Sequence, residues 1–139
     1  MPDDKRILVG IDGSDAAIRA ARLAVRIAKI PGSRITLAMI DSPEDYALMV
    51  ERESLIKAKE EFMMDILQNT KDEIAEEGIE VDTMIGLGDP AMQLAEIAKG
   101  GYGMIVVGRK GLGALKGIFS GSVSIRLAQH STVPVMIVP

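Results

Sequence analysis

A glycine-rich stretch between residues 108 and 124 carries the strongest chemical signal in the sequence. It contains the glycines Gly108, Gly111, Gly113, Gly117 and Gly121, the cations Arg109, Lys110 and Lys116, and the serines Ser120, Ser122 and Ser124. Glycine lets the backbone approach a ligand closely, and the bare amides that begin a helix attract anions. The serine hydroxyls add donors, and the cations add positive charge to an acidic chain. The stretch therefore predicts phosphate binding, with a flexible surface loop as the plainer alternative.

A second candidate is Asp12, which follows a short apolar run and precedes a glycine. A carboxylate at such a place can accept hydrogen bonds from ribose hydroxyls or hold Mg²⁺. The alternative is a plain helix cap, but Ser14 and Asp15 already serve that need. We therefore predict a ligand-binding role for Asp12.

The segment from Gly86 to Ala91 matches the G-x-G-x-x-A fingerprint of dinucleotide-binding proteins. It follows the third predicted strand instead of the first, and Pro90 removes an amide from the helix start. The acidic residue expected about 20 positions later is absent, because Gly108 and Arg109 stand there. We predict a structural turn, with Asp89 as helix cap and Pro90 at the first helical position. A Walker A loop is excluded, since no G-K-[ST] occurs.

Two further polar residues are weaker candidates. Asp41 follows the second strand, where a turn former is favoured and a site residue is the alternative. His130 falls at the end of the last helix, where the helix dipole favours a cation, and we expect no catalytic role for it.

Five short apolar segments predict strands, over residues 6–11, 34–40, 79–85, 104–107 and 133–138. Helical periodicity predicts helices over 17–28, 51–77, from 90 onward and over 122–130. In the longest helix, the predicted buried face consists of Leu55, Ala58, Phe62, Ile66, Leu67 and Ile74. Gly78 is predicted to end that helix, and the polar alternation of the third strand indicates a sheet edge.

Strands that alternate with helices predict an α/β fold, an open parallel five-stranded sheet with helices on both faces. The length of 139 residues fits a single domain over residues 1–139. In such sheets ligands bind beyond the carboxyl ends of the strands. Asp12 and the glycine-rich stretch each follow a predicted strand, so we expect both to lie at these carboxyl ends.

Composition excludes several classes of function. With no cysteine and one histidine, thiol catalysis, Cys-ligated metals and a His-relay enzyme are not expected. The net charge of −4 and the aromatic share of 3% disfavour nucleic-acid binding. No apolar run reaches about 18 residues, and the N-terminus has no apolar signal core, so we expect no membrane span and a cytoplasmic protein.

The spacing Gly108-x2-Gly111-x9-Gly121-Ser122 is similar to the ATP-binding signature of universal stress proteins. The resemblance extends along the whole chain, through the opening strand with Asp12, the turn at Gly88 and the closing segment. It implies a Rossmann-like fold with strand order 3-2-1-4-5. It also implies a protein that is usually dimeric and acts in stress survival in the cytoplasm.

Carried over by position, the resemblance implies an ATP site. Its members are Ile11, Asp12, Met39, Val107, Gly108, Arg109, Gly111, Gly121, Ser122 and Val123. Asp12 would lie beside the nucleotide and hold Mg²⁺, and Met39 would meet adenine through its backbone. Many family members carry a histidine before a hydrophobic residue where Ala38 and Met39 stand here, so adenine packing differs at this point.

The resemblance favours a nucleotide-dependent regulatory protein that binds ATP. The alternatives are a slow ATPase or phosphotransferase, and a scaffold or chaperone-like protein without nucleotide. No convincing general base is visible, so at most weak ATP turnover is expected. The apolar strand from Val133 to Val138 would lie at a sheet edge, where antiparallel pairing with a second copy gives a homodimer.

Overall fold

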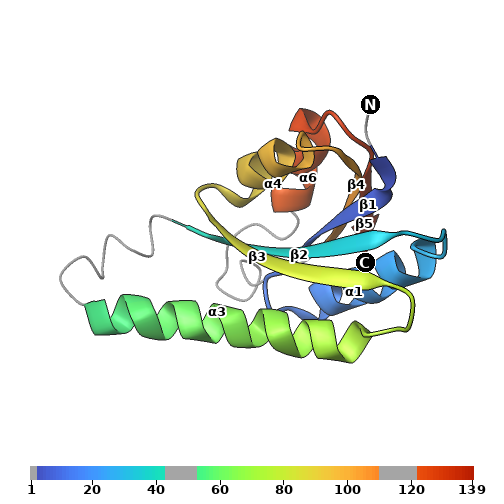
Figure 1. The fold of residues 1–139 in the computed structure, drawn as a ribbon. Coiled ribbons are helices and arrows are strands. Elements are labelled where there is room, and N and C mark those ends of the chain that lie inside the picture. Colours follow the sequence, from blue (N-terminus) through green and yellow to red (C-terminus); the bar gives the residue numbers. More distant parts are fainter. Residues whose placement is uncertain (1–2, 43–52, 110–121) are drawn as a thin grey trace.

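The computed structural model describes residues 3–42, 53–109 and 122–139. Strands and helices alternate through these residues (Figure 1). The elements are β1 (Asp3–Gly10), α1 (Asp15–Ile27), β2 (Arg34–Asp41), α3 (Glu53–Ile74), β3 (Glu80–Leu87), α4 (Pro90–Ala98), β4 (Tyr102–Gly108), α6 (Ser122–His130) and β5 (Val135–Val138). The order of elements agrees with the prediction.

The strands form one parallel sheet in the order β3-β2-β1-β4-β5. This confirms the Rossmann-like α/β fold and its strand order. The edges of the sheet are β3 and β5. The polar alternation of β3 correctly indicated an edge, because Glu80 and Asp82 are exposed there.

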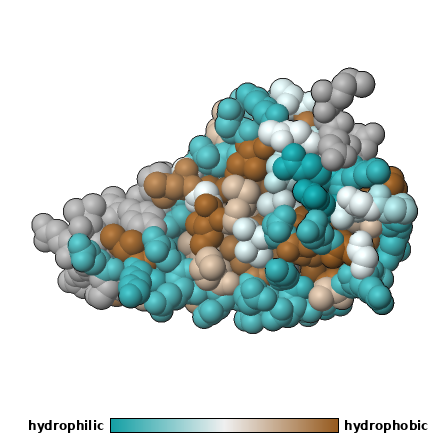
Figure 2. Space-filling view, in the orientation of Figure 1, coloured by the Kyte–Doolittle hydropathy of each residue, from teal (hydrophilic) through white to brown (hydrophobic). Residues whose placement is uncertain are grey.

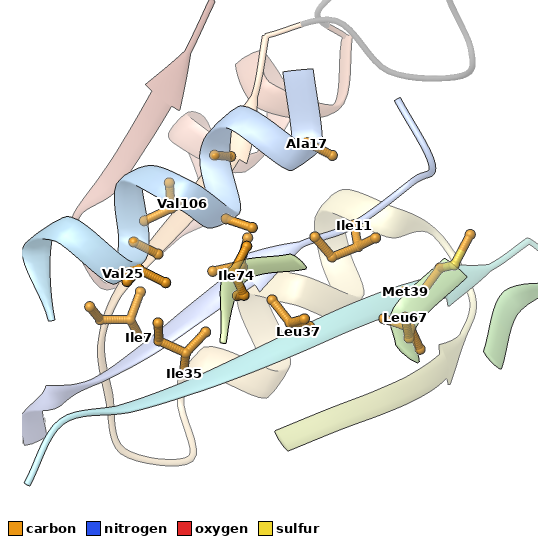
Figure 3. Packing of buried hydrophobic residues seen from close by; sticks show 14 of the residues in the cluster. Ile7, Ile11, Ala17, Val25, Ile35, Leu37, Met39, Leu67, Ile74 and Val106 are labelled. Atoms are coloured by element: carbon orange, nitrogen blue, oxygen red, sulfur yellow. The ribbon is translucent and has the colours of Figure 1, made fainter. Parts of the chain in front are cut away.

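Helices cover both faces of the sheet, with α1 and α3 on one side and α4 and α6 on the other (Figure 1). On the first side, Ile7 and Val9 of β1 and Leu37 of β2 pack against the alanines of α1 and against Leu67 of α3 (Figure 3). On the second side, Leu8 of β1 packs with residues of α4, β4 and α6. Successive residues of β1 therefore serve opposite cores, as the period-2 geometry of a strand requires.

The predicted buried face of α3 is confirmed only in the second half of the helix, where Leu67 and Ile74 are buried and Ile66 is partly buried. Met63, Leu67 and Ile74 are at most 5% exposed, whereas Leu55 and Phe62 are 42% and 62% exposed. The first turns of α3 reach past the carboxyl ends of β2 and β3 (Figure 1). Leu55 lies in these first turns, whereas Phe62 is exposed because it lies on the outer side of the helix, next to the buried Met63. The prediction of Leu55, Ala58 and Phe62 as core residues is therefore wrong.

Some element boundaries also differ from the predictions. β1 ends at Gly10, so Ile11 lies just beyond the strand. α3 ends at Ile74. Gly78 adopts φ +87° in the turn that leads into β3, and it does not cap the helix. β5 begins at Val135, because Pro134 has no N–H and contributes only its carbonyl, which accepts from the Ile105 N–H at 2.9 Å.

Among the described residues, no helix is long and apolar enough to cross a membrane.

Candidate functional site

The carboxyl ends of β1, β2 and β4 lie next to one another at one edge of the sheet (Figure 1). The chain runs outward from β1 through β2 to β3, and then returns to the other side of β1 to form β4. This reversal creates a topological switch point between β1 and β4, where open α/β sheets bind ligands.

Asp12 begins the tight turn that connects β1 to α1. Its Oδ1 accepts hydrogen bonds from the Ser14 N–H at 2.9 Å and from the Ser14 hydroxyl at 2.5 Å. The Ser14 Oγ in turn accepts from the Ala17 N–H at 3.2 Å and caps α1. Ser14 is thus the helix cap, as predicted, and Asp12 is positioned by it at the switch point.

The end of β4 lies against the start of α1. A Cβ built at Gly108 would lie 2.8 Å from the carbonyl carbon of Ala16, so only glycine allows this close approach. The Arg109 N–H donates to the carbonyl of Val138 at 2.7 Å, which extends the β4–β5 pairing by one residue. Val107 is buried, and Arg109 is exposed at the edge where the site is expected.

Met39 and Ile11 offer only their backbone to a ligand, because their side chains are 6% and 4% exposed within the core (Figure 3). The register of β1 with β2 ends at Gly10 and Ala38, with one further hydrogen bond from the Ile11 N–H to the Ala38 carbonyl at 2.8 Å. β2 continues to Asp41. Within the described ranges, the pairing of β1 with β2 therefore ends at Ala38, and β2 runs on beyond it from Met39.

The N-terminus of α6 completes this edge, since Ser122 is its first residue. Val123 is partly buried in the core on that side of the sheet. Gly111 and Gly121, the other predicted phosphate-binding residues, lie outside the described residues. A helix N-terminus presents amides that favour an anion.

An ion pair that the sequence did not reveal links α6 to the start of α4. Arg126 of α6 donates to Asp89 Oδ1 at 2.7 Å, while Asp89 Oδ2 accepts from the Met92 N–H at 3.0 Å. Asp89 caps α4 and Pro90 occupies the first turn, as predicted, so the segment from Gly86 to Ala91 is a structural turn. The hydrogen bond from Arg126, aided by the Met92 N–H, holds the pKa of Asp89 below its usual value.

Asp41 is not the turn former that the sequence favoured. It is the last residue of β2, where it pairs with Leu87 and is 3% exposed. The prediction failed because β3 continues to Leu87 and keeps β2 extended at this point. The Lys59 ammonium of α3 forms an ion pair with Asp41 Oδ1. No local pattern links a strand end to a lysine in the following helix, so the sequence carried no signal for this pair.

His130 is the last residue of α6 and is exposed. In the part of the chain that the structure describes, no three histidine, cysteine, aspartate or glutamate residues form a group that could hold a metal ion. Mg²⁺ is commonly bound by one or two carboxylates together with substrate phosphates. Asp12 is a carboxylate of this kind at the switch point.

The fold defines a doubly wound α/β protein, with its topological switch point between β1 and β4. The model of the universal stress protein family matches residues 4–139. The chain belongs to the universal stress protein family.

Similar proteins cover nearly the whole chain. Universal stress protein YxiE of Bacillus subtilis is 32% identical over 145 residues, which span 96% of this chain and 97% of that protein. The solved structure of the hypothetical protein MJ0577 matches with a TM-score of 0.85 at 25% identity, covering 96% of this chain and 94% of that one. A universal stress protein solved in complex with cAMP matches with a TM-score of 0.68 at 27% identity, covering 96% and 94%.

Proposed function

We propose that this protein binds an adenine nucleotide, with ATP and Mg²⁺ as its ligands, and acts as a nucleotide-dependent regulator of stress survival in the cytoplasm. The observation that carries the proposal is the meeting of three features at one edge of the sheet. These are the Asp12 turn, the end of β2 beyond Ala38 and the N-terminus of α6. The related universal stress protein in complex with cAMP supports an adenine nucleotide as the ligand class.

The proposed site takes its parts from different elements of one domain spanning residues 1–139. The phosphates lie against the backbone of Gly108, Gly111 and Gly121 and the amides of Ser122 and Val123, with Arg109 and Val107 at the end of β4. The ribose lies over Ile11 and Asp12. The base meets the backbone of Met39. Helix-terminal amides and glycine backbone suit the charge and the crowding of a polyphosphate.

Mg²⁺ would be held by Asp12 together with phosphate oxygens, and it would neutralise part of the phosphate charge. Asp12 already accepts two hydrogen bonds from Ser14 through Oδ1. A carboxylate that is held by two donors is better suited to binding a ligand at a fixed position than to accepting a proton. This favours nucleotide binding with slow or no hydrolysis of ATP.

The test is to denature the purified protein and identify any released nucleotide by chromatography and mass spectrometry. The matched control is Gly121→Asp, which places a negative charge where phosphate is expected. Stoichiometric ATP in the wild type and none in the variant is the expected result. If the wild type releases no nucleotide and calorimetry shows no heat on addition of ATP, the alternative of a scaffold protein without nucleotide is favoured instead.

We also propose a homodimer through the strand from Val133 to Val138. β5 is an edge strand and Ile137 is 39% exposed on it. An unpaired apolar edge favours pairing with another chain, and antiparallel pairing about a two-fold axis closes the assembly. Because neither Pro134 nor Pro139 has an N–H, the ladder between the copies must be short.

A further inference from the structure

In the described part of the chain, the sheet ends at β3 on one side and at β5 on the other. β3 runs for eight residues without a proline and pairs there with β2 alone. β5 has four residues and lies between Pro134 and Pro139. A strand edge with unpaired N–H and C=O groups is a template for a further strand. The outer edge of β3 is therefore the longer of the two templates.

The register of β3 shows which backbone groups face outward. The Gly88 N–H donates to the Asp41 carbonyl at 2.8 Å, so this residue directs its backbone N–H toward β2. Backbone groups of successive residues alternate between the two sides of a strand, and the pairing with β2 runs through β3 without a shift. Val81, Thr83 and Ile85 therefore direct their N–H and C=O groups away from β2. Three residues at this spacing match the ladder of one added strand.

A cavity of about 270 Å³ lies beside the first half of this edge, between the end of α3 and the start of β3. Its lining residues are Lys71, Ala75, Glu76, Glu77, Ile79 and Val81. Val81 packs on the α3 side of the sheet. Residues directly opposite each other on paired strands share a face, with Cβ atoms about 4.5–5.5 Å apart. The residue of an added strand opposite Val81 therefore points toward the cavity, where Ala75 and Ile79 offer apolar contact.

The other face of β3 carries negative charge. Glu80 and Asp82 are exposed there, on the side of the sheet where Met84 packs. Glu80 forms an ion pair with Arg34 at 3.0 Å, whereas Asp82 has no ion pair within the described ranges. A cation opposite Asp82 on an added strand would stabilise the pairing, and a like charge would oppose it. A second copy of β3 would bring the carboxylates of both copies onto one face, so the charge favours a basic partner.

This edge lies on an open face of the molecule. Figure 1 shows β3 in front of the rest of the sheet and above α3, and Figure 2 shows apolar residues across the same band. Leu87, the last residue of β3, is 59% exposed. A strand whose side chains are alternately apolar and cationic would match both faces of this edge.

We propose that the outer edge of β3 binds an extended segment of a partner protein in which apolar residues alternate with lysine or arginine. The backbone of residues 81–85 supplies the hydrogen bonds, the cavity takes an apolar side chain, and Asp82 selects the cation. β3 is two strand positions from β1, away from the switch point between β1 and β4. The inference is therefore independent of the proposed nucleotide binding.

The test uses a capped hexapeptide of alternating valine and lysine, with alternating valine and glutamate as the comparison peptide. NMR titration of the full chain gives the two dissociation constants, and hydrogen exchange gives the protection of each amide. At a peptide concentration about ten times the dissociation constant, the amides of Val81, Thr83 and Ile85 should exchange roughly tenfold more slowly. The amides of Asp82 and Met84, which already face β2, should change much less. We expect the glutamate peptide to bind about fivefold more weakly or worse.

Two variants and their matched controls test the parts of the proposal. Asp82→Lys should reverse the preference between the two peptides, and Asp65→Lys, the same change at an exposed aspartate of α3, should not. Thr83→Pro removes the central outward N–H, which a sheet edge tolerates, so the fold should remain and the lysine peptide should bind roughly tenfold more weakly. Met84→Pro removes an N–H that faces β2 and should lower the Tm much more than Thr83→Pro does.

The contrary outcomes are equally specific. A lysine peptide that leaves the exchange of Val81, Thr83 and Ile85 unchanged overturns the inference, and so does equal binding of the two peptides by the wild type. Protection of these three amides without peptide, lost on dilution of the protein, would assign the edge to a second copy and also overturn it. An unchanged preference in Asp82→Lys would remove the role of this carboxylate in selecting the partner.

Discussion

Replacement of Gly108 by alanine tests whether this glycine is needed for packing before any ligand binds. The new Cβ would lie 2.8 Å from both the carbonyl carbon and the Cβ of Ala16, whereas ordinary contact begins at 3.4 Å. Two of the three nearest atoms belong to the backbone of α1, which cannot turn away as the end of a flexible side chain does. Such overpacking costs about 1–3 kcal/mol. The reduced freedom of the unfolded chain offsets about 0.4–1 kcal/mol of this.

We therefore expect the free energy of unfolding of Gly108→Ala to fall by about 1–2 kcal/mol. In a chain of this length that corresponds to a decrease in Tm of about 3–7 °C. Urea denaturation followed by circular dichroism, on protein freed of nucleotide, measures it directly. An alanine variant with unchanged stability but weaker ATP binding would refute the packing argument and assign Gly108 to the ligand.

A double-mutant cycle with Ala16→Gly makes the test specific. Removing the Ala16 Cβ relieves part of the clash, so the two substitutions should couple favourably by about 0.5 kcal/mol or more. Gly78→Ala is the control, because a Cβ there meets no atom within 4 Å and only its φ of +87° is strained. It should lose about 1–2 kcal/mol and show no coupling to Ala16→Gly.

Three further predictions concern the ion pair, the long helix and the sheet edge. Arg126→Met should destabilise the protein by at most about 1 kcal/mol at pH 7, since the pair is partly exposed. Because the pKa of Asp89 is lower folded than unfolded, the pair stabilises fully above the unfolded value of about 3.9. This stabilisation disappears as the pH falls through the folded value, and a deficit in urea denaturation that persists at pH 2 would contradict the assignment. Leu67→Ala should cost about 2–5 kcal/mol and Phe62→Ala less than about 0.5 kcal/mol, and a cost of Phe62→Ala in urea titrations as large as that of Leu67→Ala would place Phe62 in the core after all. Ile137→Lys should convert a dimer to a monomer in sedimentation velocity without changing the circular dichroism spectrum, and a monomeric wild type would remove the basis for the dimer.

The sequence by itself determined the order of strands and helices and the parallel α/β class. These follow from hydrophobic periodicity, which depends only on residues close together in the chain. The helix caps Ser14 and Asp89 were also predictable, because a cap bonds to an amide two or three residues later. The strand order came from the family resemblance, since alternating strands and helices leave several orders open.

The tertiary structure alone decided which side chains meet across elements. The first half of the buried face of α3 was predicted wrongly, because a helical pattern does not show where the sheet ends or which side of each turn meets it: Met63 is buried and the neighbouring Phe62 is exposed. The pairing of Asp41 with Lys59 and of Asp89 with Arg126 depends on how helices lie against strands, which no local spacing records. The same holds for the contact between Gly108 and α1. The candidate site could be located from the sequence because the turns after the strands supply it, whereas the close approach of the end of β4 to α1 comes from packing.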